Sequence, residues 1–236
     1  MIYCVRPSKT FLFNVLERKL SKIKGGIGLD AASAGFKNRK MFKTDFYYGL
    51  DIDLDCLKSS VKKDKSQNTY AIYADMTKLD KLPSDSVDVI ISTNSLFRLA
   101  FDGRIKAIKH LCRLLAPKGL MLIDLSLDAD FKSSLEIFKN NFKKAKVVYY
   151  KNIFSRVYEG FFEKDGFLGS HPLVGTKPFL ALAWLISQLE YLTCKLPFLN
   201  KHVFIVCTNK KNCFQKNKFD LSSLLIIEKR IYNLMD

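Results

Sequence analysis

Short apolar runs alternate with amphipathic segments along most of this 236-residue chain. The apolar runs have the length of buried strands, and most of them end in small or polar residues. They cover residues 27–29, 46–50, 69–74, 87–91, 120–125, 146–150 and 202–208. Apolar residues at helical spacing predict helices over residues 11–23, 53–61, 104–115 and 131–144. Strands that alternate with helices in this way predict an α/β fold, with a parallel sheet covered by helices on both faces.

The whole chain, residues 1–236, is expected to form a single domain with two additions to the alternating pattern. Residues 155–200 are longer than a crossover between strands requires, and they predict a helical insertion. Its helix, residues 179–192, is apolar on nearly every side, so it is either buried or lies on a membrane or partner surface. At the end of the chain, Asp220 is placed to cap a helix, and residues 213–236 are expected to form a helical tail.

The formal net charge is +16, from 39 Lys and Arg against 23 Asp and Glu. Such a charge favours contact with polyanions or an anionic membrane face, although scattered lysines also form an ordinary solvated surface. Residues 1–9 lack an apolar signal region, and no apolar stretch reaches the roughly eighteen residues of a membrane span. The six cysteines form no C-x-x-C pair, so free thiols are expected rather than a disulfide framework or a zinc site. These features predict a cytoplasmic location, with peripheral membrane contact left open.

Three of the first strands end at an aspartate: Asp30, Asp51 and Asp75. Ligands of open parallel sheets bind outside the carboxyl ends of the strands, where carboxylates accept hydrogen bonds from ribose hydroxyls, an exocyclic amine or an ammonium group. Small residues follow Asp30 and allow a ligand to approach the backbone closely. Aspartates at strand ends also serve as turn formers and helix N-caps, but three in order favour a nucleoside-type ligand.

One such ligand is a nicotinamide cofactor. Residues 26–31, G-I-G-L-D-A, match the permissive G-x-G-x-x-A pattern, and Asp51 follows about twenty residues later. That pattern requires a strand before the glycines, whereas a helix is predicted before Gly26. A nicotinamide-dependent reductase is therefore an alternative that depends on a strand before Gly26.

The ordered motifs resemble those of the class I S-adenosylmethionine-dependent methyltransferases. They are G-L-D-A-A-S-A-G at residues 28–35, Y-G-L-D-I-D at 48–53, Y-A-D-M at 73–76, L-P-S-D-S-V-D-V-I at 82–90 and L-C-R-L-L-A-P-K-G at 111–119. No single motif is specific, but the set covers roughly residues 25–125 in the family's order and spacing. The resemblance implies a Rossmann-like doubly wound sheet of about seven strands, mostly parallel, in which the late strand at residues 202–208 is antiparallel.

The resemblance also implies a cofactor, S-adenosylmethionine, and a site for it. Asp30 and the loop to Gly35 would border its methionine part, Asp51 would accept hydrogen bonds from its ribose hydroxyls, and Asp75 would hold the edge of its adenine. The residues past the fourth strand would line the reaction centre, and no metal is expected. The expected cofactor-binding residues are Asp30, Ala31, Ala32, Ala34, Gly35, Asp51, Ile52, Asp75, Met76, Asn94 and Ser95. Arg113 and Pro117–Gly119 would be structural.

The loop after the first strand departs from the family pattern. The family's loop usually reads G-x-G-x-G, whereas residues 32–36 read A-S-A-G-F. Alanine tolerates a positive φ poorly, so either the loop takes a slightly different path and still binds, or the affinity for the cofactor has fallen. The first outcome predicts an active methyltransferase, and the second a cofactor-binding but catalytically inactive scaffold protein.

A small-molecule acceptor, or one linked to a lipid or sugar, is the expected substrate. In the resembling family, insertions before the last strand commonly form the acceptor lid, and an apolar lid from residues 155–200 suits a lipid-linked acceptor. Methylation of nucleic-acid bases is disfavoured, because N-S-L-F at residues 94–97 stands where the amino-methylating enzymes carry an N/D-P-P-aromatic turn. His171, in a Gly/Ser/Pro loop, is a weak candidate for a general base. Further titratable groups are His202, Asp124 and Asp128.

Overall fold

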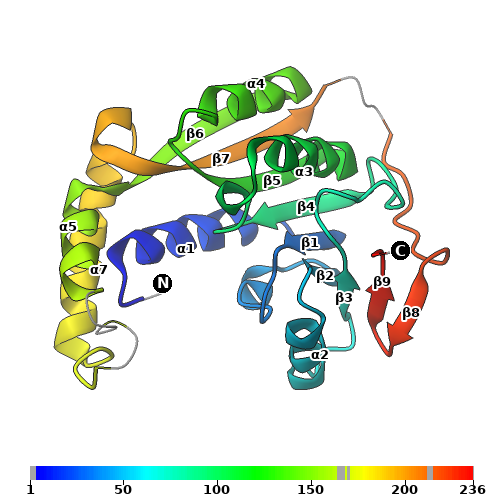
Figure 1. The fold of residues 1–236 in the computed structure, drawn as a ribbon, viewed down its shortest axis with the longest axis horizontal. Coiled ribbons are helices and arrows are strands. Elements are labelled where there is room, and N and C mark those ends of the chain that lie inside the picture. Colours follow the sequence, from blue (N-terminus) through cyan, green and yellow to red (C-terminus); the bar gives the residue numbers. More distant parts are fainter. Residues whose placement is uncertain (1–3, 164–167, 169–170, 212–214, 236) are drawn as a thin grey trace. The chain divides into compact units, whose positions relative to one another are not determined.

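The computed structural model describes residues 4–163, 168, 171–211 and 215–235, so Cys213 lies outside the described residues. The chain divides into two compact units, which we call the sheet unit (residues 20–146 and 205–236) and the helical unit (residues 1–19 and 147–204). Figure 1 labels the helices and strands. In chain order they are α1 (Pro7–Leu20), β1 (Ile27–Ala31), η1 (Arg39–Met41), β2 (Phe46–Asp51), α2 (Leu54–Lys63), β3 (Thr69–Tyr73), β4 (Val87–Ser92), η2 (Leu96–Arg98), α3 (Phe101–Leu114), β5 (Leu115–Ser126), α4 (Phe131–Asn141), β6 (Phe142–Asn152), α5 (Ile153–Phe162), α7 (Lys177–Thr193), η4 (Pro197–Leu199), β7 (Asn200–Lys210), β8 (Leu225–Glu228) and β9 (Ile231–Asn233).

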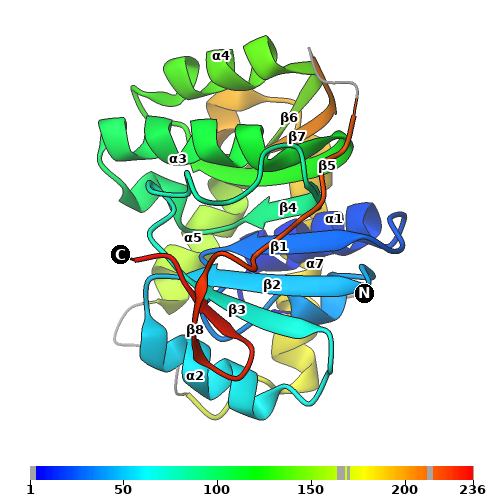
Figure 2. The same cartoon turned by 90° about the vertical axis from the view of Figure 1, so that its right-hand side faces the viewer.

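The predicted α/β fold with a mostly parallel sheet is confirmed. The strand order is β6-β7-β5-β4-β1-β2-β3-β9-β8. β1 pairs in parallel with β2 and β4, β2 with β3, β4 with β5, and β3 with β9, whereas β8 and β9 are antiparallel. The central strands β1, β4 and β5 are buried almost throughout, as expected of parallel strands that are covered on both faces. The sheet has nine strands rather than about seven, because β8 and β9 extend it beyond β3 (Figure 2).

The connection between β1 and β2 covers one face of the sheet without an α-helix. Residues 32–45, all of them described, contain only the short 3₁₀ helix η1. A Cβ built on Gly28 would lie 2.4 Å from the ring of Phe42, and one on Gly49 would lie 2.2 Å from the ring of Phe36. Both rings are buried. The two strand glycines therefore give the rings of the connection the space that side chains would otherwise fill, and the connection covers the sheet as a helix would.

The helical tail expected over residues 213–236 is wrong for its described part. Leu225–Glu228 and Ile231–Asn233 are the strands β8 and β9, and Ile231 lies opposite Ala71 of β3. Arg230 makes the turn between them with a φ of 71° and donates hydrogen bonds to carbonyl oxygens of Val61 and Ser66. The open edge of β3 offers backbone partners to this hairpin, so pairing at a distant edge decides the structure over the local apolar spacing.

The structural role expected for Arg113 agrees with its contacts. Its Nη1 donates to Leu82 O at 2.7 Å, which ties the end of α3 to the segment before β4. Lys210 meets the same corner from β7, where its Nζ donates to Arg113 O at 2.9 Å and Leu115 O at 3.1 Å and pairs with Asp85. These contacts fix the start of β5 next to the end of α3.

Polar side chains hold the helices of the helical unit together. Glu159 on α5 accepts a hydrogen bond from Ser8 N of α1 at 3.1 Å and pairs with Lys151 at 3.4 Å. Glu190 on α7 accepts from Asn152 N at 3.1 Å, and burial raises the pKa of Glu190 to about 7. Within the described ranges, no helix combines the length and the hydropathy that a membrane crossing requires.

Candidate functional site

The carboxyl ends of β4, β1, β2 and β3 are neighbours along one edge of the sheet. Asp30 near the end of β1 lies opposite Gly49 of β2, and Asp51 at the end of β2 lies opposite Tyr73 of β3. Asp75 follows shortly after the end of β3. The sheet unit thus brings the three predicted aspartates to the edge at which open parallel sheets bind ligands.

The backbone of the loop after β1 is left-handed at every second residue. The φ angle is 63° at Ala32, 45° at Ala34 and 54° at Phe36. These three positions have the spacing of the glycines in a G-x-G-x-G loop. For a residue other than glycine, the left-handed conformation costs roughly 1–2 kcal/mol of free energy. Gly35 is not left-handed, and a Cβ built on it would approach only Ser60 Oγ, at 3.9 Å. The chain therefore follows the path of a glycine loop at positions where it carries Ala and Phe.

Asp51 holds this loop from the end of β2. Its Oδ2 accepts a hydrogen bond from Ala34 N at 2.7 Å, and its Oδ1 accepts one from Asp53 N at 3.1 Å. A backbone bond from Ser33 N to Leu50 O at 3.0 Å adds a second tie. The Asp51 carboxylate is half-buried, and an ionised carboxylate has about four acceptor positions. Two protein donors therefore leave it capacity for the hydroxyls of a ribose.

Asp30 points into the protein. Its side chain is fully buried, where Tyr47 OH donates to Oδ2 at 2.9 Å and Asn38 Nδ2 donates to Oδ1 at 3.1 Å. Burial raises the pKa of Asp30 to about 7, against the two hydrogen bonds, which lower it. In this conformation the carboxyl group anchors the loop through Asn38 and has no surface exposed to a ligand. Its expected place beside the methionine part of a cofactor stays a prediction.

The ends of β2 and β3 combine apolar surface with a carboxylate. Asp75 Oδ1 accepts hydrogen bonds from Thr77 N and Thr77 Oγ1, both at 2.8 Å, so its bonds with described residues leave Oδ2 available. Ile52 is 58% exposed and Met76 is half-buried. Apolar side chains at neighbouring strand ends, together with a carboxylate oxygen, suit a flat base that carries an exocyclic amine.

The chain turns sharply after β4. Asn94 has a φ of 56°, and its backbone N donates to Oδ2 of Asp124, a fully buried carboxylate of β5, at 3.0 Å. Ser95 Oγ lies 2.7 Å from Ser92 Oγ. Four of the eight non-glycine residues with a left-handed φ in the described chain lie in the loops after β1 and β4. Strained residues of this kind cluster at binding sites, so these two loops are the candidate binding loops of the edge.

Several residues of this arrangement were not predicted. Tyr47 and Asn38 bind Asp30. Asp124 was named only as a titratable group, and its hydrogen bond with Asn94 N was not predicted. The ring of Phe36 packs edge-on against Tyr47, with centroids 5.4 Å apart. A glycine within an apolar strand often marks close approach of another group, so Gly49 was the available signal for the ring above it.

None of the candidate bases gains a clear catalytic position. His171 belongs to the helical unit, where its Nδ1 accepts a hydrogen bond from Leu173 N at 3.2 Å, and its role stays a prediction. Asp128 pairs with Arg104 at 2.8 Å. Burial raises the pKa of Asp128, but hydrogen bonds, led by the one from Arg104, outweigh burial and hold it below its usual value, which makes Asp128 a weak base. Asp124 already accepts the hydrogen bond of Asn94.

The structure also tests two other ligands, a metal ion and a nicotinamide cofactor. Among the residues that the structure describes, no three His, Cys, Asp or Glu side chains gather closely enough to hold a metal ion. β1 begins at Ile27, and within residues 4–26 the element before Gly26 is the helix α1 rather than a strand. The G-x-G-x-x-A pattern therefore lacks the strand that a nicotinamide site requires.

Comparison with protein families matches residues 25–123 to a family described as a methyltransferase domain. This match confirms the resemblance to class I S-adenosylmethionine-dependent methyltransferases that the ordered motifs predict. A comparison with curated proteins finds no match.

Solved structures with the same fold cover most of the chain. The N-methyltransferase NodS from Bradyrhizobium japonicum WM9, in complex with S-adenosyl-L-homocysteine, has a TM-score of 0.57 at 14% identity, and the match covers 86% of this chain and 88% of NodS. Phosphoethanolamine N-methyltransferase 2 of Haemonchus contortus, in complex with phosphomonomethylethanolamine and S-adenosylhomocysteine, has a TM-score of 0.51 at 15% identity over 85% of this chain and 52% of its own. The [4+2]-cyclase SpnF has a TM-score of 0.52 at 11% identity over 84% of this chain and 80% of its own. At these identities the likeness shows the fold, and a cyclase among the neighbours means that the reaction must be argued from the site.

Proposed function

We propose that this chain is an S-adenosylmethionine-dependent methyltransferase that acts on a small-molecule acceptor, free or linked to a lipid or sugar. The observation that carries the proposal is the sheet edge where Asp51 and Asp75 keep acceptor capacity beside a left-handed loop. The family match over residues 25–123 supports the class of reaction. S-adenosylhomocysteine, the demethylated product, is bound in two of the neighbouring structures and supports S-adenosylmethionine as the cofactor.

Each part of this cofactor has a matching group at the edge. The free acceptor positions of Asp51 suit the ribose hydroxyls, and Asp75 Oδ2 suits the adenine amine. Ile52 and Met76 offer apolar surface for the faces of the base. The left-handed loop that begins at Ala32 exposes backbone without large side chains, which suits the methionine part.

The protein's contribution to the reaction would be orientation. S-adenosylmethionine, when bound, supplies a methyl group on a sulfonium, which an acceptor takes in an in-line displacement. Holding the acceptor in line contributes on the order of 7 kcal/mol or more to such a step. Asn94 is suited to this task, because Asp124 holds its backbone from a fully buried position.

The alternative of a catalytically inactive scaffold rested on Ala32 and Ala34. Both residues take the left-handed conformation that a glycine would take, so the loop keeps its shape despite the substitutions. With this path in place, no feature of the loop favours loss of activity over an active enzyme.

A small-molecule acceptor is supported by two features. The neighbour from Haemonchus contortus is named for phosphoethanolamine, a small amine, and its structure holds a small phosphorylated amine. Residues 94–97 form the turn N-S-L-F in this chain, without the two prolines of the enzymes that methylate base amines. A base in nucleic acid is accordingly the less favoured acceptor.

Isothermal titration with S-adenosylmethionine and S-adenosylhomocysteine tests the proposal. Asp51→Asn is expected to weaken binding by about 10–100-fold, since hydrogen bonds to a charged group contribute about 1.5–3 kcal/mol. Asp45→Asn is the matched control, because Asp45 is an exposed aspartate just before the other end of β2, and it should bind as the unsubstituted chain does. Absence of both heat and thermal stabilisation with millimolar cofactor would contradict the proposal.

A further inference from the structure

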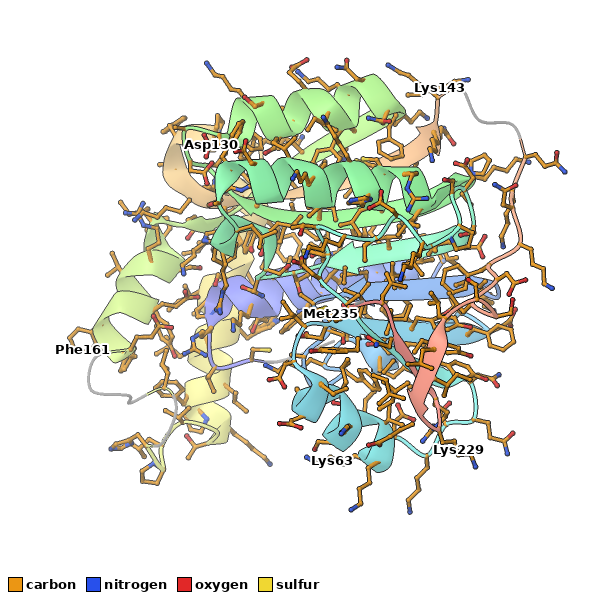
Figure 3. All side chains as sticks on the ribbon, turned by 45° about the vertical axis from the view of Figure 1, so that its right-hand side comes forward. Lys63, Asp130, Lys143, Phe161, Lys229 and Met235 are labelled. Atoms are coloured by element: carbon orange, nitrogen blue, oxygen red, sulfur yellow. The ribbon has the colours of Figure 1, made fainter. Side chains whose placement is uncertain are left out.

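Exposed apolar side chains concentrate on the helical unit. It contains ten of the sixteen exposed large hydrophobic residues in the described chain, although it is the smaller of the two units. The ten are Ile153, Phe154, Val157, Phe161, Leu173, Leu182, Leu185, Leu192, Leu196 and Phe198. Figure 3 shows Phe161 projecting outward from α5. Single exposed hydrophobic residues are common on protein surfaces, but a concentration of this kind is typical of a surface that contacts a membrane or another protein.

The helices α5 and α7 of this unit bury mostly polar residues and expose several large apolar ones. The buried positions of α7 are Ala183, Ser187, Glu190 and Thr193, while Leu185 is 60% exposed. The buried residues of α5 are Ser155, Tyr158 and Glu159, while its Val157 and Phe161 are exposed. A helix on a water-soluble core has the reverse arrangement. The outward face of these helices is therefore suited to a surrounding that is less polar than water.

The outward face of α7 forms a continuous stripe. Leu182, Leu185, Leu189 and Leu192 recur at intervals of three and four residues, and all but the half-buried Leu189 are exposed. Leu196, also exposed, follows shortly after the end of the helix. Between residues 178 and 193 the only charged side chain is Glu190, which is fully buried. This length of helix therefore presents no charge to its surroundings.

Cations lie at the two ends of the stripe. Lys177 is the first residue of α7, and Lys195 and Lys201 follow the helix; all three are exposed. We propose that the outward faces of α5 and α7 bind the surface of an anionic membrane, with the leucines in the acyl boundary and the flanking lysines at the headgroups. α7 has 17 residues, fewer than the roughly 20 of a spanning helix, so it lies in the plane of the membrane rather than across it.

A second copy of the chain is the main rival occupant, because leucines at this spacing also form helix–helix seams. The net charge of the chain argues against a second copy as the occupant. Each copy has a formal net charge of +16, so two copies repel each other, whereas an anionic lipid surface attracts both the lysines beside the stripe and the molecule as a whole. The membrane proposal does not depend on the proposed methyltransferase activity.

Trp184 provides a direct probe, since it is the only tryptophan of the chain and is half-buried within α7. The full chain is mixed with vesicles of phosphatidylcholine that contain 30 mol% phosphatidylglycerol, and with vesicles of phosphatidylcholine alone. We expect co-flotation with the anionic vesicles, a blue shift of Trp184 emission, and quenching by lipids brominated near the headgroup end of the acyl chains. Neutral vesicles and high salt should weaken the binding.

Paired substitutions test the stripe itself. Leu185→Glu with Leu192→Glu should weaken the partition onto anionic vesicles by about 100-fold, because two leucines lose their apolar environment. Leu225→Glu with Ile226→Glu on β8 is the matched control, since these residues are 64% and 60% exposed and the change in charge is the same. The control pair should bind as the unsubstituted chain does.

Three results would overturn the proposal. One is failure of the unsubstituted chain to float with anionic vesicles, and another is equal loss of binding in the control pair. The third is a dimer in light scattering that only the α7 pair disrupts, without any vesicle binding, which would assign the stripe to a second copy. Quenching of Trp184 needs no variant, so the proposal can be tested even where a substituted chain folds poorly.

Discussion

Replacing Ala32 and Ala34 with glycine should stabilise this protein. Both alanines are left-handed, with φ angles of 63° and 45°. Substitution of alanine by glycine ordinarily destabilises a folded chain, because glycine gives the unfolded chain more conformational freedom. At these two positions the folded state is strained, so the usual sign reverses.

The magnitude follows from three contributions at each position. Relief of the left-handed conformation contributes about 1–2 kcal/mol. The added freedom of the unfolded chain costs about 0.4–1 kcal/mol, and loss of a half-buried methyl group costs about 0.4 kcal/mol. The net gain is about 0.5 kcal/mol per position, or about 1 kcal/mol for the double variant, which raises Tm by about 2–4 °C in a chain of this size.

Thermal and urea unfolding of Ala32→Gly with Ala34→Gly measure this gain. Ala129→Gly is the control, because Ala129 lies in an exposed turn and is not among the left-handed residues. The control should lose about 0.7 kcal/mol by the unfolded-state effect alone. A double variant that loses stability as the control does would refute the view that the alanines are strained.

Three further predictions concern buried contacts. Gly49→Ala places a Cβ 2.2 Å from the ring of Phe36 and should lower the free energy of unfolding in urea by about 1–3 kcal/mol. Adding Phe36→Leu should recover most of this loss, and a double variant whose loss equals the sum of the two single losses would contradict direct contact. Asp30 has a pKa raised to about 7, so the folded state holds a proton that the unfolded state lacks, and the free energy of unfolding should fall as the pH rises from about 4 to about 7. Asp30→Asn should flatten that slope by up to about 1.4 kcal/mol per pH unit, and an unchanged slope in urea titrations at several pH values would exclude the assignment. Lys210→Met should destabilise the chain by about 2 kcal/mol in thermal unfolding, because it removes part-buried hydrogen bonds to Arg113 O and Leu115 O. Lys211→Met, which removes one solvent-exposed hydrogen bond, should cost much less, and equal effects would contradict this role of Lys210.

The strands and their terminal aspartates could be predicted because their signals are local. Apolar runs gave β1, β2, β3 and β4 within one or two residues, and the chain position of Asp51 and Asp75 then placed them at one edge. The parallel order follows from the alternation with helices. These parts of the fold need no knowledge of distant contacts.

The missed features depend on contacts between distant residues. The tail is a hairpin because the edge of β3 was open, which residues 225–233 by themselves do not reveal. Asp30 is buried because Tyr47 and Asn38 reach it, one from the next strand and one from a connection that lacks an α-helix. The left-handed alanines oppose their own preference, since Asp51 holds Ala34 N from across the edge.

The same hydrogen bond bears on how the loop would bind a cofactor. A loop strained at Ala32, Ala34 and Phe36 would relax unless other contacts held it. Asp51 holds Ala34 N, and the buried ring of Phe36 fixes the far end against the space above Gly49. Both contacts are made by the protein's own residues, so they would hold the loop in place for a cofactor. Asp51 would then act twice, once as the anchor of the loop and once as the acceptor for the ribose. Its substitution should therefore weaken the binding of S-adenosylmethionine more than the loss of ribose contacts alone would predict.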